Sequence, residues 1–159
     1  MDVQFYKDEQ GFYQQITEII HAEIDVVFAY LATNKISLWF PQLSYQPIDG
    51  VIHLVFDMAG EGPDEVMAIL DIRQDEFLKF EWGDGYVQFT LEETENGTLI
   101  TLDEFLTPLF PSIANDFTGW YYQMNNIRNI SETDDPSPLD DFDFKTLEYH
   151  TAQALAALE

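Results

Sequence analysis

The sequence predicts a single α+β domain in which a curved antiparallel sheet wraps around one long helix near the C-terminus. Apolar and polar residues alternate along most of segment 49–106, which is typical of β-strands. Segments 24–33 and 112–131 instead carry apolar residues at intervals of three and four, which is typical of helices. A length of 159 residues with 46% hydrophobic residues suffices for one domain with a substantial core.

The first part of the chain predicts a strand followed by two short helices. Residues 13–21 form a β-rich run, which predicts the strand. The next apolar residues recur at offsets of three, four and seven, which predicts a helix within 21–33: Ile24, Val27, Phe28 and Leu31. Asn34 is a suitable N-cap for a second short helix over 35–40, and Pro41 favours its end.

The middle of the chain predicts a meander of roughly five or six antiparallel strands, with a last strand over 98–105. Turn signals separate the runs. Asn96-Gly97 is the strongest hairpin signal, because both residues tolerate positive φ. The apolar side of the sheet needs a cover. The alternating apolar positions expected there are Ile52, Leu54, Phe56, Met58, Val66, Ala68, Leu70, Ile72, Leu78, Phe80, Trp82, Val87, Phe89 and Leu91.

The last part of the chain predicts the covering helix, an acidic linker and an extra helix. Ser112 is a suitable N-cap for the covering helix, which runs to about residue 131. Residues 132–141 combine acids and prolines without a base, which predicts a solvated linker. Residues 142–158 predict a helix with one apolar stripe: Phe144, Leu147, Thr151, Leu155 and Leu158. Such a short helix needs a surface, which its own domain, a neighbouring subunit or a partner would provide.

Charge and composition exclude several function classes. The chain has 30 acidic and 6 basic residues and a formal net charge of −24, so phosphate backbones and anionic lipid headgroups repel it. We therefore expect no nucleic-acid partner and no membrane partner. The absence of cysteine excludes disulfides and thiolate chemistry. The N-terminus lacks the features of a signal peptide, and no apolar run approaches ~18 residues, so we expect a cytoplasmic protein.

Three stretches carry a family resemblance: Ile20-His21-Ala22 through Trp39-Phe40-Pro41, Asn96-Gly97-Thr98 with the alternating strand that follows, and Gly119-Trp120. In this order they resemble the START/SRPBCC superfamily, also called birch-pollen-allergen-like or helix-grip. Within it, they resemble the branch of the activator of heat-shock protein 90 ATPase homologue, C-terminal-domain-like. The resemblance implies one START/SRPBCC-like domain over 1–159, with its core at about 13–131, the acidic linker at 132–141 and the extra helix at 142–158. The superfamily includes lipid binders, cyclases and co-chaperone domains, so the fold alone does not select a function.

No catalytic or metal-binding constellation is visible in the sequence. His21, His53 and His150 lie on three different predicted elements, without the spacing that places two imidazoles on one helix face. The glycine-rich segments 60–62 and 83–85 carry acids where a phosphate loop needs bare amides and a lysine. We therefore expect no enzyme, no metal and no cofactor.

The candidate ligand-binding residues are those expected between the sheet and the long helix. Glu104 alternates in phase with Ile100 and Leu102. It therefore faces an apolar cavity with a raised pKa, or lies beyond the buried part of the strand and contacts water. The aromatic residues either fill the core or line a cavity for an apolar or aromatic ligand. The predicted ligand-binding residues are Trp39, Phe56, Trp82, Phe89, Glu104, Phe117, Tyr121 and Met124.

Two functional hypotheses stay open, and an enzyme of the cyclase or hydrolase kind ranks last. The first is a non-catalytic domain that binds a small hydrophobic ligand, oriented by Tyr121 or Glu104. The alternative is a protein-interaction or chaperone- and stress-associated module with a filled core. Its acidic surface would steer a basic partner, or it would form a homodimer. A cavity of ligand size favours the binder, whereas a filled core with an exposed apolar patch favours the interaction module.

Overall fold

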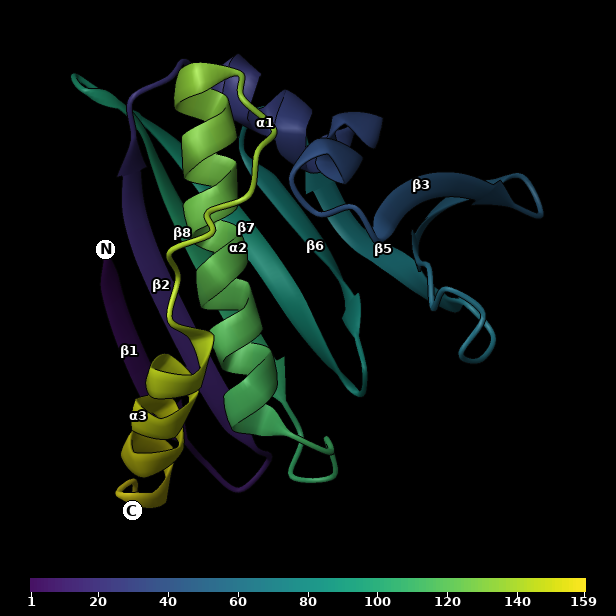
Figure 1. The fold of residues 1–159 in the computed structure, drawn as a ribbon. Coiled ribbons are helices and arrows are strands. Elements are labelled where there is room, and N and C mark those ends of the chain that lie inside the picture. The colour runs from purple at the N-terminus through teal and green to yellow at the C-terminus, as the bar shows by residue number, and fades with distance from the viewer.

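The computed structural model describes residues 1–159 and has the predicted α+β architecture, with the long helix α2 lying across one face of an antiparallel sheet (Figure 1). The sheet has eight strands in the order β1-β2-β8-β7-β6-β5-β4-β3. The strands are β1 (Asp2–Lys7), β2 (Phe12–Ile20), β3 (Leu43–Ile48), β4 (Val51–Phe56), β5 (Glu65–Arg73), β6 (Phe77–Trp82), β7 (Gly85–Thr94) and β8 (Gly97–Leu106). The helices are α1 (Ile24–Ala32), the 3-10 helix η1 (Asn34–Leu38), α2 (Ile113–Thr133) and α3 (Phe144–Ala156).

The sequence pattern misses two strands, and both lie at an edge of the sheet. β1 pairs with β2 from Asp2↔Thr17 to Lys7↔Phe12, and β3 pairs with β4 from Leu43↔Phe56 to Ile48↔Val51. β3 contains Pro47, which counts against a strand in a sequence pattern. Because β3 is the last strand of the sheet, the amide that proline lacks is not needed for pairing on the open side.

The prediction that Val66, Leu70 and Ile72 of β5 face the core is wrong. Met67 points into the core, whereas Val66, Leu70 and Ile72 are 49%, 51% and 47% exposed. β5 carries apolar residues on both faces, so alternation alone does not select the buried face. Its pairing with β6 also shifts register between Ile69 and Asp71. In Figure 1, β3 and β5 lie well away from α2, which leaves this end of the sheet with less cover.

The neighbouring strand β4 shows the same limit of alternation. Leu54 is buried as predicted and Phe56 is half-buried, but Ile52 is exposed and Val55, on the opposite face, is buried. On β6, β7 and β8 the predicted positions do face the core, except that Trp82 at the end of β6 is half-buried. The central strands therefore follow the period of two, and the deviations concentrate where the sheet extends beyond α2.

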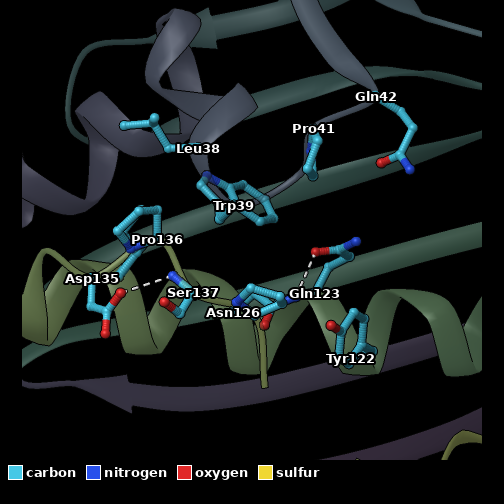
Figure 2. A pocket seen from close by; sticks show the side chains of 12 residues that line it. Leu38, Trp39, Pro41, Gln42, Tyr122, Gln123, Asn126, Asp135, Pro136 and Ser137 are labelled. Atoms are coloured by element: carbon cyan, nitrogen blue, oxygen red, sulfur yellow. Dashed lines mark hydrogen bonds between the residues drawn. The ribbon is translucent and has the colours of Figure 1, made fainter. Parts of the chain in front are cut away.

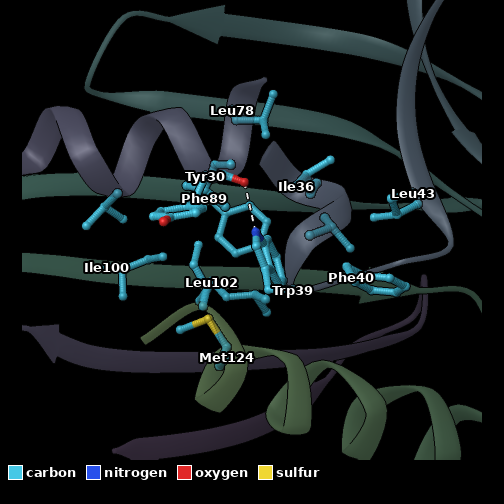
Figure 3. Close-up of a cluster of buried hydrophobic side chains, with 14 of the residues drawn as sticks. Tyr30, Ile36, Trp39, Phe40, Leu43, Leu78, Phe89, Ile100, Leu102 and Met124 are labelled. Atoms are coloured by element: carbon cyan, nitrogen blue, oxygen red, sulfur yellow. Dashed lines mark hydrogen bonds between the residues drawn. The ribbon is translucent and has the colours of Figure 1, made fainter. Parts of the chain in front are cut away.

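A continuous hydrophobic core fills the space between the sheet and the helices α1, η1 and α2 (Figure 3). Phe80, Phe89 and Trp120 meet there, with ring centroids 5.9–6.4 Å apart. The Trp39 indole N–H donates a hydrogen bond to the carbonyl oxygen of Tyr30 at 2.8 Å, which satisfies its polar atom inside the core. The centre of the grip is therefore occupied by side chains.

The C-terminal extension packs on its own domain. The linker runs back along α2 (Figure 1), and its residues are mostly exposed, as predicted. The Leu139 N–H donates to Asn126 Oδ1 at 3.5 Å, which ties the linker to α2. α3 contacts α2 and β1, and its Thr151 is buried. Asn115 Nδ2 on α2 donates a hydrogen bond of 2.7 Å to Glu148 on α3. The apolar stripe of α3 therefore has an intramolecular partner surface, on the side of α2 next to β1.

We expect the melting temperature of the protein to rise when sodium chloride is added. The ion pairs are Arg128–Glu18 at 2.8 Å, Arg73–Asp71 at 3.7 Å and the N-terminal amine with Glu18 at 3.9 Å. Most of the 30 acidic residues therefore have no basic partner. Their repulsion is screened as the Debye length falls from ~30 Å at 0.01 M salt to ~8 Å at 0.15 M. Calorimetry over this range tests the expectation, and a flat or falling curve would contradict it.

Candidate functional site

A groove opens where β4 and β6 end against the N-terminal half of α2. It consists of two adjoining pockets, of about 430 Å³ and about 340 Å³, which share Phe56, Trp82 and Asp116. We call it the mouth groove. The residues that line it are Phe40, Gln42, Phe56, Met58, Glu65, Trp82, Gly83, Asp84, Leu109, Phe110, Pro111, Asn115, Asp116, Gly119, Trp120, Tyr122, Gln123 and Phe144.

Aromatic rings form the floor of the mouth groove. Phe56 is the last residue of β4 and Trp82 the last of β6, so both rings stand at the rim of the sheet. The Trp82 and Trp120 ring centroids are 5.1 Å apart, and those of Phe56 and Trp82 are 6.0 Å apart, in edge-to-face arrangements. Because Trp120 belongs to the core, this floor continues into the packed interior and offers a fixed apolar surface to a ligand.

A glycine on α2 keeps the groove open. Gly119 lines the mouth groove between Trp120 and the N-terminal turns of the helix. A Cβ atom at this position would meet no heavy atom within 4 Å. A side chain at Gly119 would therefore begin in open space.

Two carboxyl groups meet at the base of the groove. Asp116, in the first turn of α2, accepts hydrogen bonds of 3.1 Å at both oxygens from the Trp82 indole N–H. Glu104, only 1% exposed, hydrogen-bonds to Asp116 from inside the sheet. Gln14 Nε2 donates to Glu104 Oε1 at 3.3 Å and to the Phe117 carbonyl at 3.0 Å. Glu104 Oε2 receives no hydrogen bond from any N–H or hydroxyl group.

Burial decides which of the two carboxyl groups holds a proton. Burial raises the pKa of Glu104 well above its usual range, and the adjacent Asp116 carboxylate raises it further. Burial also raises the pKa of Asp116, but the hydrogen bonds from Glu104 and Trp82 oppose this rise. Glu104 is the more deeply buried and receives only one hydrogen bond, so burial favours its neutral form, whose O–H can donate a hydrogen bond to Asp116. The negative charge then lies on Asp116, at the groove surface.

The structure distributes the predicted ligand-binding residues over three places. Phe56 and Trp82 line the mouth groove, and Glu104 lies directly behind it. Tyr121 is half-buried beside Phe142, with ring centroids 6.0 Å apart, on the side of α2 that faces the linker. The remaining four are buried: Trp39, Phe89, Phe117 and Met124.

Sequence reasoning missed Asp116, although a usable signal exists. Asp116 precedes Trp120 by four residues, so the helical spacing that turns Trp120 toward the sheet also turns Asp116 to that side. Gln14 had no such signal. It lies opposite Glu104 only because β2 pairs with β8 in the register Gln14↔Glu104, and a long-range register cannot be obtained from local patterns.

A second pocket, of about 250 Å³, lies between η1, α2 and the linker (Figure 2). Trp39 contributes its floor, and it shares Gln42, Tyr122 and Gln123 with the mouth groove. Its amides already bind each other and the linker, since Asn126 Nδ2 donates to Gln123 Oε1 at 3.0 Å and Asn126 Oδ1 accepts from Leu139. We regard it as an extension of the mouth groove.

No three His, Asp or Glu side chains gather closely enough to hold a metal ion. His21 Nδ1 lies 2.9 Å from the carbonyl of Asn96, and His53 Nδ1 lies 2.9 Å from that of Val51. No helix is both long and apolar enough to cross a membrane.

Comparison with known proteins finds similarity in structure. No protein-family model and no curated protein matches the sequence. A conserved protein of unknown function from Enterococcus faecalis, EF2215, aligns over 99% of this chain and 92% of its own, with a TM-score of 0.88 and 27% identity. CalU16 from Micromonospora echinospora aligns over 98% and 96%, with a TM-score of 0.69 and 19% identity.

The solution structure of the Aha1 dimer from Colwellia psychrerythraea covers 75% of this chain and 95% of its own, with a TM-score of 0.61 and 18% identity. At these identities CalU16 and Aha1 show a shared fold. In this chain the fold consists of the eight-stranded sheet, the long helix α2 and the short helices after β2. The chain thus has the helix-grip fold that the START/SRPBCC resemblance predicts, and it matches CalU16 and Aha1 in structure.

Proposed function

We propose that the chain is a non-catalytic binding protein that holds a small apolar or aromatic molecule in the mouth groove. The observation that carries this proposal is the aromatic groove itself, open at the end of a filled core. Its two pockets, of about 430 Å³ and about 340 Å³, fall within the range of ~300–1,000 Å³ typical of small-molecule sites. The helix-grip fold supports the proposal by analogy with binders in the superfamily.

Burial of apolar surface supplies the affinity in this proposal. A flat ligand would lie against the half-buried rings of Trp82 and Phe56, and the buried Trp120 ring, 5.1 Å from that of Trp82, holds this floor in place from the core. Little side-chain entropy is then lost on binding, because the floor is preorganised. The Asp116 carboxylate is the polar group that would orient the ligand. It takes the role that the sequence analysis gave to Tyr121 or Glu104.

The test fills the groove from Gly119. In Gly119→Phe the new Cβ has open space at the wall of the groove, so we expect the ring to occupy the groove and to leave the core intact. We expect the variant to bind the neutral fluorescent probe N-phenyl-1-naphthylamine at least about tenfold more weakly than the native chain. Its melting temperature should not fall, because phenylalanine has a higher helix propensity than glycine, which costs roughly 0.5–1 kcal/mol relative to alanine in a helix interior.

Gly119→Ala is the matched control, since a methyl group leaves most of the groove free. This variant should bind the probe as the native chain does. Absence of probe binding to the native chain would contradict the proposed function. Equal binding by Gly119→Phe and Gly119→Ala would place the probe elsewhere and would contradict the assignment of the site.

A protein-interaction role is the second candidate, and the exposed apolar side chains of β4 and β5 favour it. Val51, Ile52, Val66, Leu70 and Ile72 are all about half exposed. The Colwellia relative is a dimer, so a second copy of this chain is one candidate partner, and the acidic surface would also steer a basic protein. Native mass spectrometry of protein purified from its own host separates the candidates, because it shows a retained small molecule or a retained chain.

A further inference from the structure

The walls of the mouth groove carry acids and no base. Glu65, Asp84 and Asp116 line it, and no lysine, arginine or histidine does so. The formal net charge of −24 makes the wider surroundings negative as well. A ligand with a carboxylate or phosphate group would be repelled from this surface. The groove therefore selects against anions and in favour of neutral or cationic molecules.

Asp116 keeps free capacity for a hydrogen-bond donor on the ligand. Asp116 lines both pockets. Its hydrogen-bond donors within the protein are the Trp82 indole N–H and the Glu104 carboxyl group. The ion pairs of the structure involve other acids, so Asp116 has no cationic partner. A carboxylate accepts about four hydrogen bonds. Asp116 is thus a half-buried carboxylate that lines both pockets and can accept further hydrogen bonds.

The second buried acid strengthens this reading. Glu104 is fully enclosed, and its Oε2 has no N–H or hydroxyl partner. The Asp116 carboxylate is therefore the acceptor to which a protonated Glu104 can donate a hydrogen bond. This hydrogen bond holds the Asp116 carboxylate in position at the floor. Glu104 is therefore a positioning residue, and Asp116 is the group available for contact with a ligand.

The aromatic floor favours the same kind of ligand. Trp82, Trp120 and Phe56 line the same pocket as Asp116, and the Trp82 indole N–H contacts its carboxylate directly. A cation over the face of an aromatic ring is attracted by the negative face of the ring, and tryptophan is the strongest of these partners. Charge and aromatic surface together are complementary to a cationic group attached to an apolar body.

We propose that the ligand of the mouth groove is a hydrophobic amine, with its ammonium group paired to Asp116 and its apolar body against Trp82 and Phe56. This inference depends on the proposed binding function and adds the chemical class of the ligand. Binding is non-covalent and leaves the amine unchanged. The amine supplies the cationic partner that Asp116 lacks, through a charge-assisted hydrogen bond.

Three naphthalene probes of nearly equal size test the proposal. 1-Naphthylmethylamine is a cation near neutral pH, 1-naphthalenemethanol is neutral and 1-naphthoate is an anion. In isothermal titration at about 0.15 M sodium chloride, long-range attraction is screened beyond ~8 Å. We expect the native chain to bind the amine about tenfold more tightly than the alcohol, and the alcohol more tightly than the carboxylate. Asp116→Asn should remove the preference for the amine and keep the affinity for the alcohol.

Asp84→Asn is the matched control, because it removes one charge from the rim of the same groove, at an exposed position. It should keep most of the preference for the amine. Equal affinities of the native chain for amine and alcohol would overturn the proposal without the use of any variant. An equal loss in Asp84→Asn and Asp116→Asn would also overturn it, since the general negative potential would then suffice. If none of the three probes binds, the alcohol included, the proposed binding function itself fails.

Discussion

Replacement of Trp120 by alanine is expected to lower the free energy of unfolding by about 3–5 kcal/mol. Trp120 is 2% exposed and joins the groove to the core. Its ring centroid lies 5.1 Å from that of Trp82, 5.3 Å from that of Phe40 and 5.9 Å from that of Phe89. The substitution therefore removes a large buried side chain and leaves a cavity among rings that the backbone holds in place.

Chemical denaturation measures this loss, and Tyr149→Ala is the control. Tyr149 is also an aromatic residue on a helix, but it is 61% exposed. Its replacement should change the stability by no more than about 0.5 kcal/mol. If the denaturation midpoint of Trp120→Ala stayed close to that of the native chain, the packing of α2 against the sheet would be less important than its burial indicates.

The fold could be predicted from the sequence where local patterns and tertiary packing agree. On β8, Ile100, Leu102 and Glu104 alternate in phase, and all three are buried. On α2 the spacing of Phe117, Trp120 and Met124 selects the face that contacts the sheet, and these residues are buried as well. In both cases a single apolar face exists, so only one orientation removes it from water.

The prediction fails where a strand has two apolar faces or none that dominates. β5 has Val66 and Leu70 on one face and Met67 and Ile69 on the other. Which face is buried depends on how far the helices extend over this end of the sheet, and that is a property of the tertiary structure. The edge strand β1 was missed for a different reason, since its pairing with β2 depends on a neighbour and its own composition is mixed.

The candidate site could be predicted only in part, because it combines residues from distant segments. Alternation leaves two placements open for Glu104, inside the domain or in water beyond the buried part of β8, and its 1% exposure shows that it lies inside. The polar partners of Glu104 come from β2 and α2, through a strand register and a helix position that no local pattern contains. The aromatic residues are predicted to lie between the sheet and the helix. Which of them line open space depends on where a side chain is missing, as at Gly119.

Glu104→Gln is expected to become more stable relative to the native chain as the pH rises. Burial and the neighbouring Asp116 raise the pKa of Glu104 well above 4.5, the usual value for a glutamate side chain. Above this pH the unfolded chain loses the proton while the folded chain keeps it, so the folded state binds more protons. The stabilising contribution of Glu104 is thus fully present below pH 4.5 and is lost as the pH rises through the folded-state pKa. The loss is at most about 1.4 kcal/mol for each pH unit.

Glutamine keeps the shape of the side chain and can still donate a hydrogen bond to Asp116, but it does not titrate. The difference in unfolding free energy between the native chain and Glu104→Gln should therefore shift steadily in favour of the variant as the pH rises from 4.5 toward neutrality. Urea denaturation at several pH values measures this difference directly. Comparison with the native chain cancels the titration of the other acids, Asp116 included, to the extent that they are unchanged by the substitution.

Glu92→Gln provides the control, because Glu92 is an exposed residue on β7 and its replacement removes the same unit of charge from the unfolded chain. Its stability curve should run parallel to that of the native chain. A parallel curve for Glu104→Gln as well would mean that Glu104 ionises in the folded state as it does in the unfolded chain. The base of the groove would then hold two adjacent negative charges. The assignment of a single charge to Asp116, with Glu104 as the proton-holding residue behind it, would have to be abandoned.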